Sequence, residues 1–333
     1  MADAAGLDDT VGRLGEKAVL ARVLDALRGS SRAVVGPGDD AAVLAAPGGR
    51  VVVSTDTLVH GPDFRLAWSS GYDLGWKAAA VNLADIAAMG AAPVALFVAL
   101  ALPDATSVSF VEDLARGLRD ACDALAPGCA VEGGDLTASD VLTIAVTAIG
   151  VPQGTPAVLR SGARPGDVLA VAGELGPAAR GLALLFERFR DAAGVPIAVD
   201  VEALTAPERA DLSAQLRPSP PIGLGIVAAR AGATAMMDVS DGLLLDATRL
   251  AEASGVTLDL DLDLGPDLDD AALRGGEDHA LLACFPRGAA LPTGFVPIGR
   301  AEERAGAPVT IAGSPVTGHL GWDPHQDWDA GRG

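Results

Sequence analysis

Five short segments of the chain place carboxylates beside glycine or hydroxyl residues, where strands or helices are expected to end. The clearest is Ser54-Thr55-Asp56-Thr57, which follows the β-branched run Val51-Val52-Val53. Such oxygens are ligands for hard cations, and Mg²⁺ in particular takes octahedral oxygen ligands while keeping waters and phosphates in its shell. The other four segments are Gly38-Asp39-Asp40, Asn82-Leu83-Ala84-Asp85, Gly133-Gly134-Asp135-Leu136-Thr137 and Asp238-Val239-Ser240-Asp241-Gly242. Together they predict a magnesium-nucleotide site.

Each segment taken alone has a simpler explanation, because an aspartate beside glycine at a strand end is typical of a turn or a helix N-cap. Zinc is a poorer candidate metal, since it prefers Cys and His ligands. The histidines and cysteines have no metal-ligand spacing, and the thiols are expected to be unbridged core residues. These residues are His60, His279, His319, His325, Cys122, Cys129 and Cys284.

Common nucleotide and hydrolase motifs are absent from the sequence. There is no GxxxxGK[ST] loop, no GxGxxG turn with an acidic residue downstream, and no GxSxG nucleophile turn. A protein with this sequence that handles phosphates must therefore do so through metal ions and a few arginines.

The elements expected to position these segments alternate between strand and helix. A strand over Val51–Val53 would present Ser54 to Thr57 at its tip, and a helix over Gly71–Met89 would carry Asn82 and Asp85 on one face. Gly150–Gly154 marks a boundary between two domains, 1–153 and 154–333. Further strands are expected at 93–102, 141–149, 168–171, 233–237 and 279–285, and helices at 107–124, 178–189, 221–231 and 242–254. This alternation predicts an α/β fold.

Charge and hydropathy exclude two classes of partner. A formal net charge of −20 argues against nucleic acid, whose binding needs basic patches. The apolar run from Ile86 to Leu102 contains Gly90 and Pro93, so a helix end followed by a buried strand explains it better than a membrane span. The first residues lack the apolar core of a signal peptide. A cytoplasmic protein is expected.

The same motifs, in order, resemble those of thiamine-monophosphate kinases, members of the aminoimidazole ribonucleotide synthetase-like superfamily. The resemblance covers nearly the whole chain, from roughly residue 10 to residue 325. It rests on Gly38-Asp39-Asp40-Ala41-Ala42, Ser54-Thr55-Asp56-Thr57-Leu58, the segment from Lys77 to Ala91, Gly133-Gly134-Asp135, Arg160-Ser161-Gly162-Ala163, Arg217-Pro218-Ser219-Pro220, Asp238-Val239-Ser240-Asp241-Gly242-Leu243 and Gly275-Gly276-Glu277-Asp278.

The resemblance implies a two-domain fold of the α+β type, with an N-terminal sheet that pairs across a homodimer and a C-terminal α/β domain that completes the active site. It also implies a reaction in which ATP phosphorylates thiamine monophosphate to thiamine diphosphate. The matching positions suggest Asp40, Ser54, Thr55, Asp56, Asp85, Asp135, Asp238 and Asp241 as Mg²⁺ ligands; Gly134, Asp135, Arg160 and Ser240 as ATP contacts; and Glu277 and Trp322 as contacts to thiamine.

Elementary chemistry agrees with these implied roles. The acceptor phosphate is already ionised at neutral pH, so no residue is expected to act as an acid or base, and Asp241 would act through the metal. Arg160 would add fixed positive charge. Glu277 could face the thiamine cation and Trp322 could stack on its ring. The alternatives are a turn-capping carboxylate for Glu277 and an apolar anchor of the C-terminal tail for Trp322.

One position departs from the family pattern. The family commonly has a His-Phe pair after the strand tip, whereas this chain has Asp63-Phe64. An aspartate there could still face cationic thiamine, so Asp63 is retained as a candidate substrate contact. Two rival functions stay open at this point: a superfamily enzyme with another phosphoryl acceptor, and a non-catalytic protein that binds Mg²⁺ and nucleotide.

Overall fold

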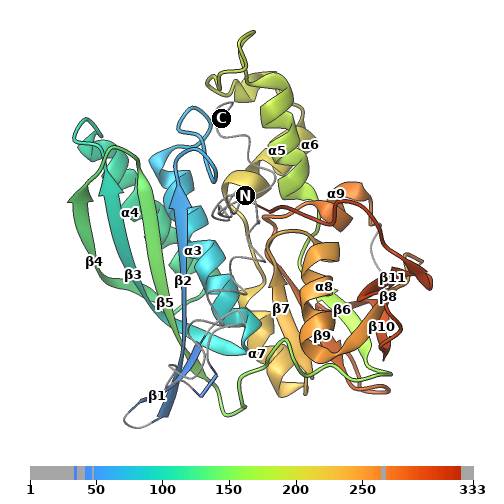
Figure 1. Cartoon of the computed structure of the whole chain (residues 1–333). Helices are drawn as coiled ribbons and strands as arrows, with labels where there is room; N and C mark the ends of the chain where they lie inside the picture. The colour runs from blue at the N-terminus through green and yellow to red at the C-terminus, as the bar shows by residue number, and fades with distance from the viewer. Residues whose placement is uncertain (1–33, 36–41, 47–48, 264–267, 324–333) are drawn as a thin grey trace, which may run out of the picture.

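The computed structural model describes residues 34–35, 42–46, 49–263 and 268–323 (Figure 1). Two β-sheets lie side by side, and helix α3 (Gly71–Ala88) packs between them. Its buried side chains include Leu74, Leu83 and Ile86, which contribute to a core that also contains residues of the second sheet such as Met236. Within the described residues, no helix is long and apolar enough to cross a membrane.

The first sheet has five strands in the order β1-β2-β5-β3-β4. All neighbours are antiparallel except β3 and β4. The strands are β1 (Ala42–Ala46), β2 (Gly49–Val59), β3 (Ala91–Leu102), β4 (Ala130–Ala138) and β5 (Thr143–Pro152).

Within the described residues, helices cover only one face of this sheet. Along β5, burial alternates residue by residue, so that Ile144, Val146 and Ala148 are buried on the side of α3 and α4 (Val108–Leu125). The two helices approach closely because glycine faces backbone at their contact: a Cβ on Gly75 would lie 2.0 Å from the carbonyl oxygen of Leu114. In the described part of the chain no helix covers the opposite face, where Thr55 and Phe97 are exposed and the outward residues of β5 are half-buried.

The second sheet has seven strands in the order β12-β11-β8-β10-β6-β9-β7. Strand β7 is buried throughout and lies at the edge nearest α3. The strands are β6 (Val168–Ala172), β7 (Ala235–Val239), β8 (Val256–Leu260), β9 (Ala280–Phe285), β10 (Val296–Glu303), β11 (Val309–Ile311) and β12 (Ser314–Pro315).

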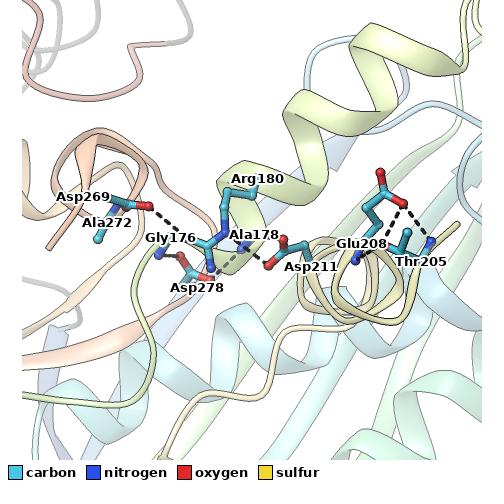
Figure 2. Close-up of polar contacts among 9 residues, drawn as sticks. All are labelled: Gly176, Ala178, Arg180, Thr205, Glu208, Asp211, Asp269, Ala272 and Asp278. Carbon is cyan, nitrogen blue, oxygen red and sulfur yellow. Dashed lines mark hydrogen bonds and ion pairs between the residues drawn. The ribbon is translucent and has the colours of Figure 1, made fainter. Parts of the chain in front are cut away.

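The remaining helices pack around the second sheet and above the gap between the sheets. Helices α5 and α6 form a pair at the top of the molecule in Figure 1. Arg180 links them, since its Nε lies 3.3 Å from the carboxylate of Asp211 (Figure 2). The helices are α5 (Pro177–Arg188), the short 3₁₀ helix η1 (Val201–Ala203), α6 (Ala206–Leu216), α7 (Ile222–Arg230), α8 (Leu243–Ser254) and α9 (Asp270–Arg274).

Three local predictions are corrected by this fold. Strand β2 continues to Val59, so Ser54 to Thr57 lie inside the strand rather than beyond its tip, consistent with the β propensity of Thr and Val. Gly133 to Asp135 lie inside β4 rather than in a turn, because pairing with β3 overrides the turn preference of glycine. Helix α6 was not predicted, although Thr205 and Glu208 form its capping box.

Candidate active site

Strand β2 and helix α3 bring the first group of predicted residues together. Ser54 pairs with Ala148 and Asp56 with Val146 on β5, so both side chains share the face that α3 covers. The Ser54 hydroxyl donates to Oδ2 of Asp85 at 2.6 Å, and the Asp56 amide donates to Oδ1 of Asn82 at 3.1 Å. The helix therefore uses the predicted Asn82–Asp85 face to hold this part of β2.

The second group lies at the carboxyl end of β7. Nδ1 of His279 is 3.0 Å from Oδ2 of Asp238, and both side chains are buried. Asp241 begins the turn into α8 and is held by Arg249, whose Nη1 donates to its Oδ2 at 2.5 Å. The same Nη1 donates to Oδ1 of the fully buried Asp246 at 2.7 Å.

The charges of the two groups act on one another. Loss of water around Asp56 and the negative charges of Asp238, Asp241 and Glu277 raise the pKa of Asp56 to about 6, against an opposing effect of His279. Burial likewise raises the pKa of Asp241 despite its contact with Arg249. Asp56 of the first sheet therefore lies within electrostatic reach of Asp238 and Asp241 of the second, and the repulsion between these carboxylates would be reduced by a cation bound near them.

The described carboxylates do not form a closed metal cage. Among these residues, no three Cys, His, Asp or Glu side chains are grouped so that they could hold an ion. Mg²⁺ does not require such a cage, because it keeps several waters and is bound through one or two carboxylates together with phosphate oxygens. The oxygen donors that converge here fit that coordination.

The Gly275–Asp278 turn meets the turn after β7. The amide of Glu277 donates to the carbonyl oxygen of Ser240 at 2.8 Å, and a Cβ on Gly276 would lie 2.2 Å from that oxygen. Glu277 itself has a φ of 75°, an uncommon value for a residue with a side chain. This close backbone contact directs the Glu277 carboxylate toward α3.

There the Glu277 carboxylate pairs with the ammonium of Lys77, which is 4% exposed. This ion pair lowers the pKa of Glu277 although burial opposes the shift. With its amide oriented to satisfy its neighbours, Gln215 of α6 accepts from Lys77 at 3.1 Å and donates to the Ala178 carbonyl at 3.0 Å. Lys77 thus connects α3 to the second half of the chain.

Asp278 of the same turn caps helix α5. Its Oδ2 accepts from the Gly176 amide at 2.7 Å and its Oδ1 from the Ala178 amide at 2.8 Å (Figure 2). A carboxylate at this position satisfies amides that the first turn of a helix leaves unbonded and complements the helix dipole. The turn therefore positions both Glu277 and the helix above it.

A cavity of about 550 Å³ opens between these elements. Four predicted site residues line it, namely Asp63, Ser240, Glu277 and Trp322. The amide of Trp322 donates to the Asp241 carbonyl at 2.9 Å, which holds the C-terminal segment beside the carboxylates. Asp63 accepts from the Val59 amide at 2.6 Å, and burial raises its pKa.

The remaining predicted residues lie elsewhere. Thr55 faces away from α3 and donates to the Val146 carbonyl at 2.9 Å. Gly134 and Asp135 are exposed on β4, where a Cβ on Gly134 would collide with the Val98 carbonyl. Arg160 precedes β6, and its carbonyl oxygen accepts from Ser254 at 2.6 Å. Asp40 lies outside the described residues.

Sequence reasoning missed the roles of Lys77, Asp278 and His279. Lys77 carried a usable signal, because it directly precedes the apolar run Ala78–Val81 and lysine is almost never fully buried unless paired. For Asp278 and His279 the partners are distant in sequence, and nothing local indicates them.

Comparison with known proteins identifies relatives of this chain. Residues 38–152 match the family described as AIR synthase related protein, N-terminal domain. The chain is 42% identical to a thiamine-monophosphate kinase of Mycobacterium tuberculosis, with 94% of this chain and 92% of that protein covered. It is 43% identical to a thiamine-monophosphate kinase of Corynebacterium glutamicum, with 87% of each covered. Among solved structures, AaThiL complexed with AMPPCP and TMP superposes with a TM-score of 0.82 at 30% identity, covering 96% of this chain and 99% of that one.

Proposed function

The chain belongs to the thiamine-monophosphate kinase family, and we infer that it is a phosphotransferase that uses ATP to convert thiamine monophosphate into thiamine diphosphate. A single structural observation carries this function at the level of residues. Asp56 of the first sheet and Asp238 and Asp241 of the second converge beside a cavity that Glu277 and Trp322 line. The AMPPCP and TMP of the related complex correspond to the two substrates.

We propose that Asp56, Asp238 and Asp241 hold Mg²⁺, together with Asp85, whose carboxylate lies beside Ser54. When bound, Mg²⁺ neutralises phosphate charge and aligns the donor and acceptor oxygens for direct in-line transfer. The effect of Asp238 and Asp241 on Asp56 supports this role, because their negative charges raise the pKa of Asp56 and a bound cation would relieve that repulsion. Asp40, Ser54, Thr55 and Asp135 complete the proposed ligand set on the basis of family position.

The protein's own groups would orient the substrates. The acceptor phosphate needs no general base, so the chain contributes position and charge rather than proton transfer. Ser240 lies between the carboxylates and the cavity, which supports its contact with ATP phosphates. Gly134, Asp135 and Arg160 remain proposed ATP contacts from family position.

The cavity residues suit the thiamine part. The Glu277 side chain is 38% exposed although its Oε2, which pairs with Lys77, is buried, so the exposed part of the side chain supports a contact with a cation in the cavity. Asp63 adds a second carboxylate at the wall, and the exposed Trp322 ring offers a face for a cationic thiazolium. We propose these three as substrate contacts.

We further propose that the protein is a cytoplasmic homodimer built from domains 1–153 and 154–333. The open face and edge of the first sheet support the dimer, because they expose Phe97, Val131 and Leu136, the last with 64% of its surface accessible. Uncovered apolar side chains and an unpaired strand edge are typical of an interface.

The direct test is to incubate purified protein with ATP, thiamine monophosphate and Mg²⁺ and to separate the products by chromatography. We expect thiamine diphosphate and ADP to form in equal amounts. Turnover should be lost when a chelator removes the metal and restored when Mg²⁺ is added. Failure to form the diphosphate at any metal concentration, in protein shown to be folded, would exclude the proposed reaction.

A further inference from the structure

We propose that Phe186 and its neighbours form the subsite for the aminopyrimidine ring of the substrate and thereby set the direction in which the substrate lies in the cavity. This inference rests on the proposed function. It concerns the wall of the cavity made by helix α5, which contributes none of the carboxylates discussed above.

One face of α5 is directed into the cavity. Ala179, Leu182, Ala183 and Phe186 line the cavity at a spacing of three, four and seven residues, which places them along a single side of the helix, and the buried Leu185 lines it beside them. Phe186 is 37% exposed, although a phenylalanine on a helix that packs against α6 would ordinarily be covered. The cavity therefore has an apolar wall that ends in an accessible aromatic ring.

Aromatic and guanidinium groups hold that ring in place. Trp68 meets Phe186 edge to face with centroids 5.0 Å apart, and the Trp68 indole N–H donates to the Phe189 carbonyl at 3.1 Å. The Arg65 guanidinium lies 5.9 Å from the centroid of the Phe186 ring, and that of Arg190 lies 5.4 Å from it. These contacts stiffen the ring, and its remaining surface is accessible in the cavity.

The charges around Phe186 discriminate between the two rings of the substrate. Thiamine monophosphate carries a cationic thiazolium next to the phosphate arm and a neutral aminopyrimidine at the other end. A thiazolium over Phe186 would lie beside the guanidinium groups of Arg65 and Arg190 and would be repelled. A neutral planar ring has no such cost and gains from stacking.

The opposite wall of the cavity carries negative rather than positive charge. Ser240 and Glu277 line the cavity and connect directly to Asp241 and Asp238, where the phosphate must arrive. The thiazolium, adjacent to the phosphate, then falls beside the Glu277 carboxylate and the Trp322 ring. The phosphate of the substrate accordingly points toward the carboxylates. The thiazolium ring lies against Trp322 and the aminopyrimidine ring lies against Phe186 of α5.

The test compares thiamine monophosphate with a truncated analogue that keeps the phosphate and the thiazolium but carries a methyl group in place of the pyrimidinylmethyl group. In Phe186→Ala we expect the KM for thiamine monophosphate to rise about tenfold, while kcat and the KM for ATP stay near wild type. The inhibition constant of the truncated analogue should be unchanged, because that ligand has no ring to place on Phe186.

Two matched variants control for indirect effects. Phe186→Tyr keeps the ring and should retain the wild-type KM, and Glu187→Ala alters the next exposed residue of α5, which does not line the cavity. Equal weakening of both ligands in Phe186→Ala, or no change in either, would overturn the orientation while leaving the kinase reaction intact. Absence of turnover in the wild type would overturn the reaction and the orientation together.

Discussion

The ammonium of Lys77 and the carboxylate of Glu277 form an ion pair between residues 200 positions apart in the sequence. The pair is asymmetric: the lysine side chain is 5% exposed and the glutamate side chain 38%. An ammonium without its partner would therefore stay buried, whereas a carboxylate without its partner could be hydrated. The interaction joins helix α3 to the turn that shapes the cavity.

From this asymmetry we expect Glu277→Gln to lower the free energy of unfolding by about 2 kcal/mol, because it leaves a buried ammonium unpaired. Lys77→Met should lower it by about 1 kcal/mol or less. Urea unfolding monitored by circular dichroism at neutral pH measures both. The double variant should recover part of the loss, because no unpaired charge remains. A larger loss in Lys77→Met would show that the pair does not control stability as its burial indicates.

Asp56→Asn should abolish turnover and flatten the pH dependence of stability. The pKa of Asp56 is about 6 in the folded protein against an ordinary 3.8, so the folded state retains a proton that the unfolded state releases between these values. The free energy of unfolding of the metal-free wild type should accordingly fall as pH rises through this interval. The variant lacks this contribution, and its kcat should drop about 100-fold or more.

Urea titrations in chelator from pH 4 to pH 7 measure the slope for both proteins, over the interval that the Asp56 shift defines. Added Mg²⁺ should stabilise the wild type more than the variant, since only ligands that bind the folded state raise its stability. Parallel slopes together with wild-type turnover would show that Asp56 is neither perturbed nor a metal ligand.

Removal of the Asp278 carboxylate should loosen helix α5. Asp278→Ala leaves the amides of Gly176 and Ala178 without their acceptor, at a cost of about 1–3 kcal/mol. Because α5 lines the cavity, the KM for thiamine monophosphate should rise more than the KM for ATP. Thermal unfolding and steady-state kinetics check both effects, with the exposed Asp104→Ala as control. An unchanged melting temperature would contradict the capping role.

Helix α7 offers a matched pair of glycines for testing the contact between α3 and the second half of the chain. A Cβ on Gly225 would lie 2.0 Å from the Ala87 carbonyl oxygen, whereas a Cβ on Gly223 meets nothing within 4 Å. We expect Gly225→Ala to destabilise by about 1–3 kcal/mol and Gly223→Ala to stabilise by roughly 0.5 kcal/mol. If the two variants shifted the chemical denaturation midpoint equally, the close approach of α7 to α3 at Gly225 would not contribute to stability.

Local patterns determined much of the fold. Helical spacing put Asn82 and Asp85 on one face of α3, and both meet β2 in the structure. The expected strands and helices of the second half are also present, as β6, α5, α7, β7, α8 and β9, but helices α6 and α9 and strands β8, β10, β11 and β12 were not predicted. Where prediction failed, tertiary pairing overrode local preference: glycine suggests a turn at Gly133 and Gly134, but β3 holds them in a strand.

The sequence by itself identified the oxygen-bearing segments and the family, because both depend on short motifs read in order. Only the tertiary structure decided three relationships. The negative charge of Asp238 acts on Asp56, the ammonium of Lys77 pairs with the carboxylate of Glu277, and Phe186 lines a cavity. The spacing of apolar residues assigns an apolar face to a helix such as α5. That spacing does not determine whether the face packs against other residues or lines a cavity. That outcome depends on how distant segments pack.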